Sequence, residues 1–123
     1  MIAFDPFTSL CLLESMSYVV ISVDRNGIIN FWNKAAELTL GFNAHEAVGE
    51  HANLVIPFTM QSAHGFCFTQ SQETVKEFAM KKDVVLPFLH KSGNIVKLKG
   101  HAPIIRGPDG VPSGSAVIGF QVT

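Results

Sequence analysis

The chain has 123 residues, of which 47% are hydrophobic and 15% charged. This length and composition predict one folded domain with a buried core and exclude an intrinsically disordered protein. The formal net charge of -1 without a basic cluster argues against nucleic acid as a partner, and no apolar run reaches the roughly 18 residues of a membrane helix. Cys11 and Cys67 form no CxxC motif and no signal peptide opens the chain, which indicates a reduced, cytoplasmic setting.

The N-terminal residues predict a short helix. Asp5 is a suitable N-cap, and Pro6 takes the first helical position, where its missing N–H leaves no hydrogen bond unmade. The helix over residues 7–17 is apolar on too many sides for a free surface helix. We therefore expect it to flank the domain and to pack on a neighbouring element or on a second copy of the chain.

Two strands and two helices are predicted next. The β-branched runs at 18–24 and 28–32 flank Asn26-Gly27, a pair that provides the backbone geometry of a tight hairpin. Asn33 is a suitable cap for the helix after it. Residues 43–46 read as a capping box that opens a second, very short helix.

The second half of the chain predicts one long helix and three strands. Helical periodicity runs from about residue 60 to residue 80, and strand character returns at 83–90. Residues 95–105 alternate between a face with lysines and a histidine and a face of apolar or small residues, and the last strand spans 115–123. Because Pro87 cannot donate a hydrogen bond, we expect the 83–90 strand at an edge of the sheet.

Helices placed between two groups of antiparallel strands predict an α+β domain. This order, with YVVISVDRNGIINFWNKAAELTLGF, the later EAVGEHANLVIP and the turn Lys91-Ser92-Gly93, resembles the PAS family. The resemblance assigns residues 18–123 to the PAS domain and residues 1–17 to an N-terminal flanking helix. It implies a five-stranded antiparallel sheet in the order 2-1-5-4-3, with short helices cupping one face around a pocket.

The resemblance also implies a role. PAS domains are regulatory sensor and interaction modules of signal-transduction proteins such as two-component systems, and an output domain is expected beyond this sequence. The chain carries no nucleophile elbow, phosphate-binding loop, dinucleotide fingerprint or zinc-protease motif, so we expect no enzymatic activity. Its five histidines show no paired spacing of metal ligands.

Covalent flavin photochemistry is not expected. Light-oxygen-voltage members of the family carry a reactive cysteine at a position that falls on Ala52. Two flavin-binding asparagines of that subfamily fall on Phe88 and Leu98, which cannot supply their hydrogen bonds, and Gln121 alone matches the subfamily's strand glutamine. Cys67, on the predicted long helix, reads as a small buried hydrophobe.

Heme b is the cofactor that the resemblance leaves open. Heme-binding members coordinate iron through a histidine on the long helix, and His64 lies at the family spacing, seven residues after Pro57. A neutral imidazole on an apolar wall is a suitable axial ligand, and Phe68 one turn later would help to keep the site dry. The family's distal position falls near Val84, but no arginine follows His64 in the helix to meet the propionates. His64 reads equally well as an ordinary helix residue.

Small residues on the inward face of the fourth predicted strand suggest a pocket. Gly100 and Ala102 leave space beside Leu98, although phenylalanines, of which the chain has ten, are an alternative filling. We therefore predict a cofactor- or ligand-binding set that consists of His64, Phe68, Val84, Leu98, Gly100, Ala102 and Gln121. His64 is the metal ligand of this set if heme binds.

The sequence leaves three hypotheses open. A sensor of a small ligand or heme predicts a bound molecule, a ligand-free dimerisation module predicts a filled pocket, and an enzyme predicts turnover. The apolar helix at 7–17 and a last strand that is apolar on both faces favour a homodimer.

Overall fold

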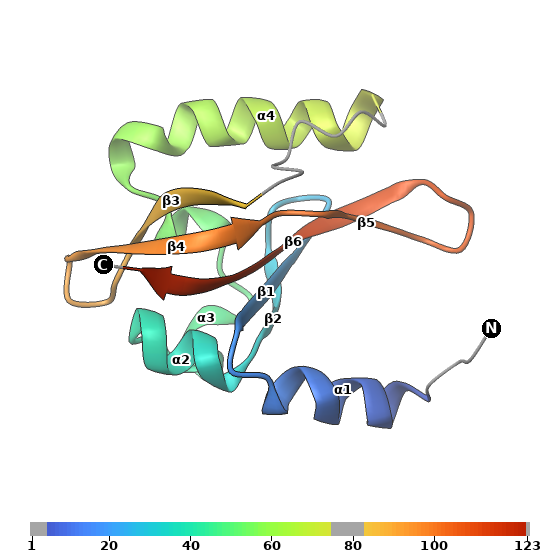
Figure 1. The fold of residues 1–123 in the computed structure, drawn as a ribbon. Helices are drawn as coiled ribbons and strands as arrows, with labels where there is room; N and C mark the ends of the chain where they lie inside the picture. The colour runs from blue at the N-terminus through green and yellow to red at the C-terminus, as the bar shows by residue number, and fades with distance from the viewer. Residues whose placement is uncertain (1–4, 75–82, 123) are drawn as a thin grey trace.

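An antiparallel sheet forms the centre of the fold (Figure 1). The computed structural model describes residues 5–74 and 83–122, except for the side chains of Phe66, Cys67 and residues 70–74. The prediction of a buried Cys67 thus lies outside the described side chains. The elements, in chain order, are α1 (Pro6–Ser15), β1 (Val19–Asp24), β2 (Ile29–Trp32), α2 (Lys34–Leu40), α3 (Ala44–Ala47), the 3-10 helices η1 (Ala52–Val55) and η2 (Phe58–Met60), α4 (Gln61–Thr74), β3 (Val84–Leu89), β4 (Ile95–His101), β5 (Ile104–Arg106) and β6 (Pro112–Val122).

The main strands follow the order β2-β1-β6-β4-β3, and β5 pairs with β6 beside this path. This confirms the α+β class and the predicted strand order, but the sheet has six strands instead of five. The segment 95–105 was expected as one strand and forms β4 and β5, because Pro103 lacks the N–H that a continuous ladder needs. β6 begins at Pro112, earlier than predicted, since its first residues pair with β5.

The two sheet edges lie where the sequence predicted them. Within the described sheet β2 has β1 as its neighbour and β3 has β4. Pro87 pairs in register with Lys97 on one side, so its missing N–H faces the open edge of β3.

Local hydrogen bonds form the predicted turns and caps. The Asp24 carboxylate accepts from the backbone N–H groups of Asn26 at 2.8 Å and Ile28 at 3.1 Å, and Gly27 has a φ of 79°, which glycine adopts without strain. The capping box between Asn43 and Glu46 is present. These contacts confirm the predicted hairpin and helix starts.

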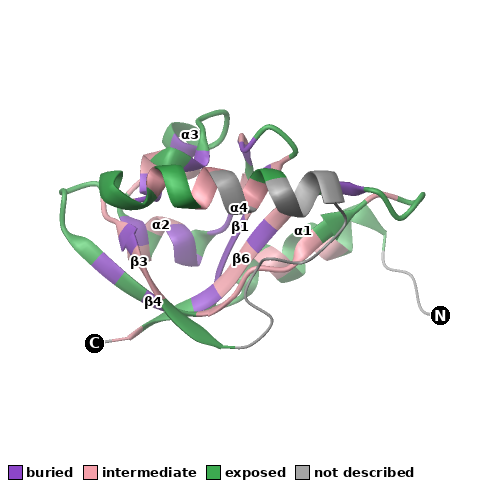
Figure 2. Ribbon diagram, turned by 90° about the horizontal axis from the view of Figure 1, so that it is seen from above, coloured by how far each residue is buried: buried purple, intermediate pink, exposed green. Residues whose placement is uncertain are grey.

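The core lies between the sheet and the helices that follow β2. Alternate residues of β1 point to this inner face and pack with Trp32 and with the buried residues of α2, while the described part of α4 lies across the same side (Figure 2). On β4 the lysines point outward and Leu98 is buried, as the alternation predicted. No described helix is long and apolar enough to cross a membrane.

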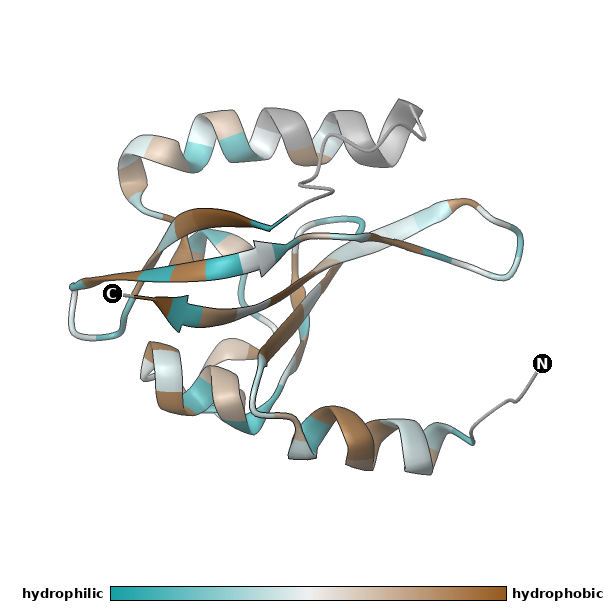
Figure 3. Ribbon diagram, viewed as in Figure 1, coloured by the Kyte–Doolittle hydropathy of each residue, from teal (hydrophilic) through white to brown (hydrophobic). Residues whose placement is uncertain are grey.

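The first helix differs from the rest of the fold. No residue of α1 is buried, and the ribbon of α1 carries hydrophobic colour in the middle of the helix (Figure 3). Phe7, Leu10 and Leu12 are exposed by 77%, 46% and 50%. The described residues of α1 therefore leave apolar surface in solvent.

Candidate functional site

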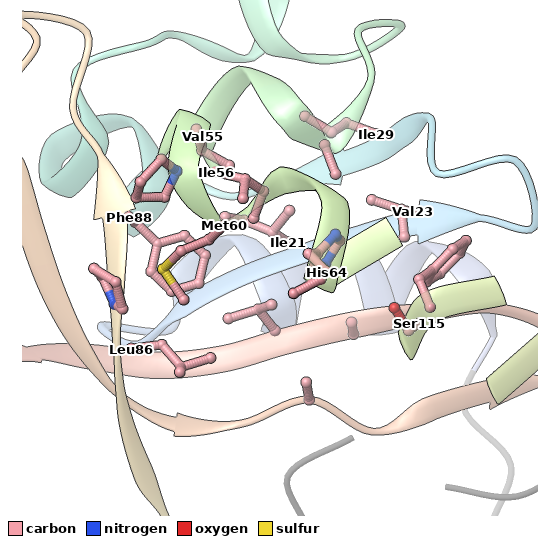
Figure 4. A pocket seen from close by; sticks show the side chains of 18 residues that line it. Ile21, Val23, Ile29, Val55, Ile56, Met60, His64, Leu86, Phe88 and Ser115 are labelled. Atoms are coloured by element: carbon pink, nitrogen blue, oxygen red, sulfur yellow. The ribbon is translucent and has the colours of Figure 1, made fainter. Parts of the chain in front are cut away.

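A cavity of about 320 Å³ lies between the inner face of the sheet and the start of α4 (Figure 4). This volume lies within the range of small-molecule sites, roughly 300–1,000 Å³. Its lining consists of Ile21, Val23, Ile29, Ala52, Val55, Ile56, Pro57, Met60, Ala63, His64, Phe68, Leu86, Pro87, Phe88, Ala102, Ser115, Ala116 and Val117.

The strand register explains the floor of the cavity. β1 and β6 pair so that Ile21 stands opposite Val117 and Val23 opposite Ser115. Because side chains alternate along a strand, these four point to the same inner face. On the other side α4 begins directly after η2, and its contacts with β6 hold its first turns across the sheet.

His64 is the main polar group of the cavity. Its Nδ1 atom is buried and has no hydrogen-bond partner. Its ring lies parallel to that of Phe68, with 6.3 Å between the ring centroids. Burial lowers the pKa of the His64 imidazole below its ordinary value, and the charge of His51 lowers it further. At neutral pH the cavity therefore contains an uncharged imidazole.

Ser115 is the second polar side chain on the wall. Its side chain is partly exposed, and its hydroxyl makes no hydrogen bond within the part of the chain that the structure describes. The other described lining side chains are aliphatic or aromatic, apart from the Met60 thioether, and none of them carries a charge. The arrangement suits a mostly apolar molecule with one or two hydrogen-bonding atoms.

The structure divides the predicted binding set into three groups. His64, Phe68 and Ala102 line the cavity. Val84, Leu98 and Gly100 lie around a separate hollow of about 10 Å³ between β3, β4 and β6, which is at most large enough for one water molecule. Gln121 is exposed and lines neither space.

Gly100 corrects the sequence interpretation of small residues on β4. It stands opposite Gly119 of β6, and a Cβ atom added to Gly100 would lie 2.0 Å from the Ile118 carbonyl oxygen. The glycine therefore permits a close approach of two backbones and leaves no room for a ligand. Ala102, two residues later, does face the cavity.

Sequence reasoning missed most of the wall, including Ser115, Met60 and Leu86. These residues come from separate elements, and only the folded sheet brings them together. The alternation of β6 was the available signal, since it places Ser115 and Val117 on one face.

The lining of the cavity fits heme only in part and lacks the reactive cysteine of flavin-binding members. A buried imidazole on an apolar wall suits an axial heme ligand, but no described lining residue is cationic and able to meet the propionates. Lys76, Lys81 and Lys82 lie outside the described residues. Ala52, at the position of the flavin-reactive cysteine, presents a methyl group to the cavity. The described residues contain no group of three or more potential metal ligands.

Solved structures with this fold are numerous and differ widely in sequence. A crystal structure of the PAS domain of a protein from Colwellia psychrerythraea is 18% identical, with a TM-score of 0.79, and covers 95% of this chain and 96% of its own. An RNA-binding light-oxygen-voltage receptor is 15% identical, with a TM-score of 0.76, and the match covers 97% of this chain and 33% of the receptor. The PAS domain of the Cronobacter turicensis RpfR quorum-sensing receptor, in complex with BDSF, is 16% identical, with a TM-score of 0.68, and covers 89% of this chain and 97% of its own.

At these identities the structural matches show the fold alone. The sequence itself matches the family described as the PAS fold over residues 12–120, which is most of its length. Strand order, helix placement and this match agree, and the chain belongs to the PAS family of sensory domains.

Proposed function

We propose that this PAS domain is a regulatory sensor that binds a small, mostly apolar molecule in the cavity beneath α4 and catalyses no reaction of its own. The observation that carries the proposal is the cavity of about 320 Å³, whose described walls are apolar apart from His64 and Ser115. Close packing leaves few voids larger than a water molecule in most protein interiors. A cavity of this size that borders the hydrophobic core and contains the His64 imidazole is therefore a candidate binding site.

The position of the cavity supports a sensory role. Its walls come from β1, β2, η1, α4, β3 and β6, so a bound molecule would contact most of the fold at once. A ligand stabilises the conformation that binds it, by an amount that grows with the logarithm of its concentration relative to its dissociation constant. Binding would thereby favour one arrangement of α4 against the sheet, which an output domain can read.

A structural relative provides an example of such binding. The RpfR receptor PAS domain has been solved with BDSF and, separately, with C12:0. The low identity transfers neither molecule to this chain. The example supports the proposal only in that a domain of this fold accommodates a small ligand.

The test uses an apolar fluorescent probe, N-phenyl-1-naphthylamine, with the purified protein. We expect saturable fluorescence enhancement with wild-type protein and a loss of at least about tenfold in affinity for Ala102→Leu, which fills the cavity. Lys99→Leu adds the same side chain on the opposite face of the sheet and should leave probe binding unchanged. Equal binding to all three proteins would contradict the cavity as the site.

We also propose that the domain forms a homodimer through α1. The support is the exposed apolar surface of Phe7, Leu10 and Leu12 on a helix without a buried residue. Phe7→Glu should shift the sedimentation coefficient toward the monomer, while Glu14→Lys, also exposed on α1, should not. A wild-type protein that sediments as a monomer at high concentration would contradict this proposal.

Heme binding is the second candidate, favoured by the unpartnered imidazole of His64. His64 would hold the iron as axial ligand, and the bound group would supply reversible binding of a diatomic gas. After incubation with hemin, wild-type protein and His101→Ala should then show a Soret band, and His64→Ala should show none. A wild-type protein without a Soret band would eliminate this candidate.

A further inference from the structure

We infer that the ligand of this cavity carries a single neutral hydrogen-bonding group, held between His64 and Ser115, on an otherwise uncharged apolar body. The inference rests on the proposed function and names the ligand class for the same site. A medium-chain alcohol is the simplest member of this class. A fatty acid anion of the same length is not a member.

The two polar side chains lack partners and face the same space. The buried Nδ1 of His64 has no hydrogen-bond partner among the described residues. The Ser115 side chain is partly exposed, and its hydroxyl makes no hydrogen bond to the described residues. In the view of Figure 4 both lie toward the Val23 end of the cavity, away from Leu86. Buried polar atoms in native structures nearly always bond to protein or to ordered water, so the Nδ1 atom of His64 is a place where a polar atom of a ligand can bind.

The chemistry of both groups suits a hydroxyl. A neutral imidazole nitrogen donates or accepts a hydrogen bond according to its tautomer, and a serine hydroxyl does either. An alcohol group also donates and accepts, so it can complete the pair in either tautomer. A ligand without a polar atom would leave the buried Nδ1 of His64 unsatisfied.

The absence of charge on the described wall favours a neutral group. An ionised carboxylate loses much of its hydration on burial and needs a cation or several donors in return. No described lining side chain is cationic, and burial keeps the His64 imidazole neutral by lowering its pKa. The remaining wall, with Ile21, Leu86 and Phe88, offers only apolar surface to the body of the ligand.

The experiment is a set of NMR titrations of ¹⁵N-labelled protein at neutral pH. The ligands are 1-butanol, 1-hexanol and 1-octanol, each paired with the carboxylate of equal length. For the alcohols we expect affinity to rise about fourfold with each buried methylene group. Each carboxylate should bind at least about tenfold more weakly than its alcohol.

Three variants separate the head-group contacts from general packing. His64→Phe keeps an aromatic ring but removes both nitrogens, and Ser115→Ala removes only the hydroxyl. Each should weaken alcohol binding by roughly fivefold, as expected for one lost hydrogen bond. Met60→Leu changes the apolar wall at similar volume and should alter alcohol and carboxylate binding to the same extent.

The outcomes distinguish this inference from the proposed function. Saturable alcohol binding that neither His64→Phe nor Ser115→Ala weakens beyond Met60→Leu would overturn the head-group assignment and leave the cavity as a ligand site. Carboxylates that bind as tightly as alcohols would overturn the neutral class. If no alcohol and no carboxylate binds, while N-phenyl-1-naphthylamine does, the inference fails and the proposed function stands. If the dye also fails to bind, both fail.

Discussion

Two polar side chains on the inner side of this domain, the fully buried Asn33 and the partly buried His64, occupy opposite situations. Asn33 is fully buried, and its oxygen accepts from the backbone N–H groups of Val20 at 3.1 Å and Ala36 at 3.0 Å. Its amide group donates to the carbonyl oxygens of Leu13 at 3.1 Å and Tyr18 at 2.8 Å. The buried Nδ1 atom of His64, in contrast, has no hydrogen-bond partner among the described residues.

The difference separates a group that maintains the fold from a group available to a ligand. Asn33 joins the end of α1, the start of β1 and the first turn of α2 through its own hydrogen bonds. Nothing in the fold depends on a hydrogen bond of the His64 Nδ1 atom. The comparison predicts that substitutions at the two positions have effects of very different size on stability.

Asn33→Ala should produce the largest effect. It removes the partner of two buried N–H groups and of two partly buried carbonyl oxygens, and each buried group left unpaired costs about 1–3 kcal/mol. We therefore expect a loss of about 3 kcal/mol or more in the free energy of unfolding, measured by urea denaturation. Asn30→Ala, at an exposed position of β2, should change it by less than about 0.5 kcal/mol.

Gly100→Ala tests the part of the inner face where the backbones of β4 and β6 are in close contact and leave no cavity. Because its Cβ atom would meet the Ile118 carbonyl oxygen, we expect about 1–3 kcal/mol of destabilisation in the same assay. Gly65 of α4 has no atom within 4 Å of an added Cβ. Gly65→Ala should therefore stabilise the protein, by up to about 1 kcal/mol. A tolerated alanine at Gly100 would contradict the observed contact.

The pH dependence of stability should identify His64 as a histidine held neutral by the fold. Its folded pKa lies below the unfolded value, so the unfolded chain binds more protons as the pH falls through that interval. Stability should therefore decrease on acidification from about pH 7.5 to about pH 5.5. The charge of His51 also lowers the pKa of His64 and so acts in the same direction.

The control for this pH effect is His64→Phe, which removes the titrating group. Its urea midpoint should fall less between the two pH values than that of wild-type protein. Identical pH profiles for the two proteins would show that His64 does not titrate abnormally.

The smallest effect is expected for His64→Phe at neutral pH without ligand. The variant removes no hydrogen bond of Nδ1 and retains a ring beside Phe68. Its free energy of unfolding should lie within about 0.5 kcal/mol of wild type. A loss as large as that of Asn33→Ala would remove the distinction between the two sites.

The sequence predicted the parts of this fold that depend on local chemistry. The Asn26-Gly27 turn, the Asn33 cap and the edge position of Pro87 each follow from one residue type at one place, and the structure contains all of them. The break at Pro103 had the same kind of signal and was overlooked. The resemblance to the family supplied the strand order.

The cavity was less accessible because it depends on contacts between distant elements. The family spacing placed His64 on the cavity wall, yet nothing local distinguishes Gly100, which closes a backbone contact, from Ala102, which borders open space. The alternation of the last strand places Ser115 and Val117 on one face, but it does not show that this face borders the cavity of His64. The pairing register of the strands determines what Gly100, Ala102 and Ser115 each contact.

The most direct test of the ligand site is a crystal structure of the wild-type protein grown with 1-octanol. We predict one alcohol molecule in the cavity beneath α4, with its oxygen about 3 Å from Nδ1 of His64 and its alkyl chain toward Leu86 and Phe88. A cavity that is closed by its own side chains, with no alcohol inside, would contradict the account.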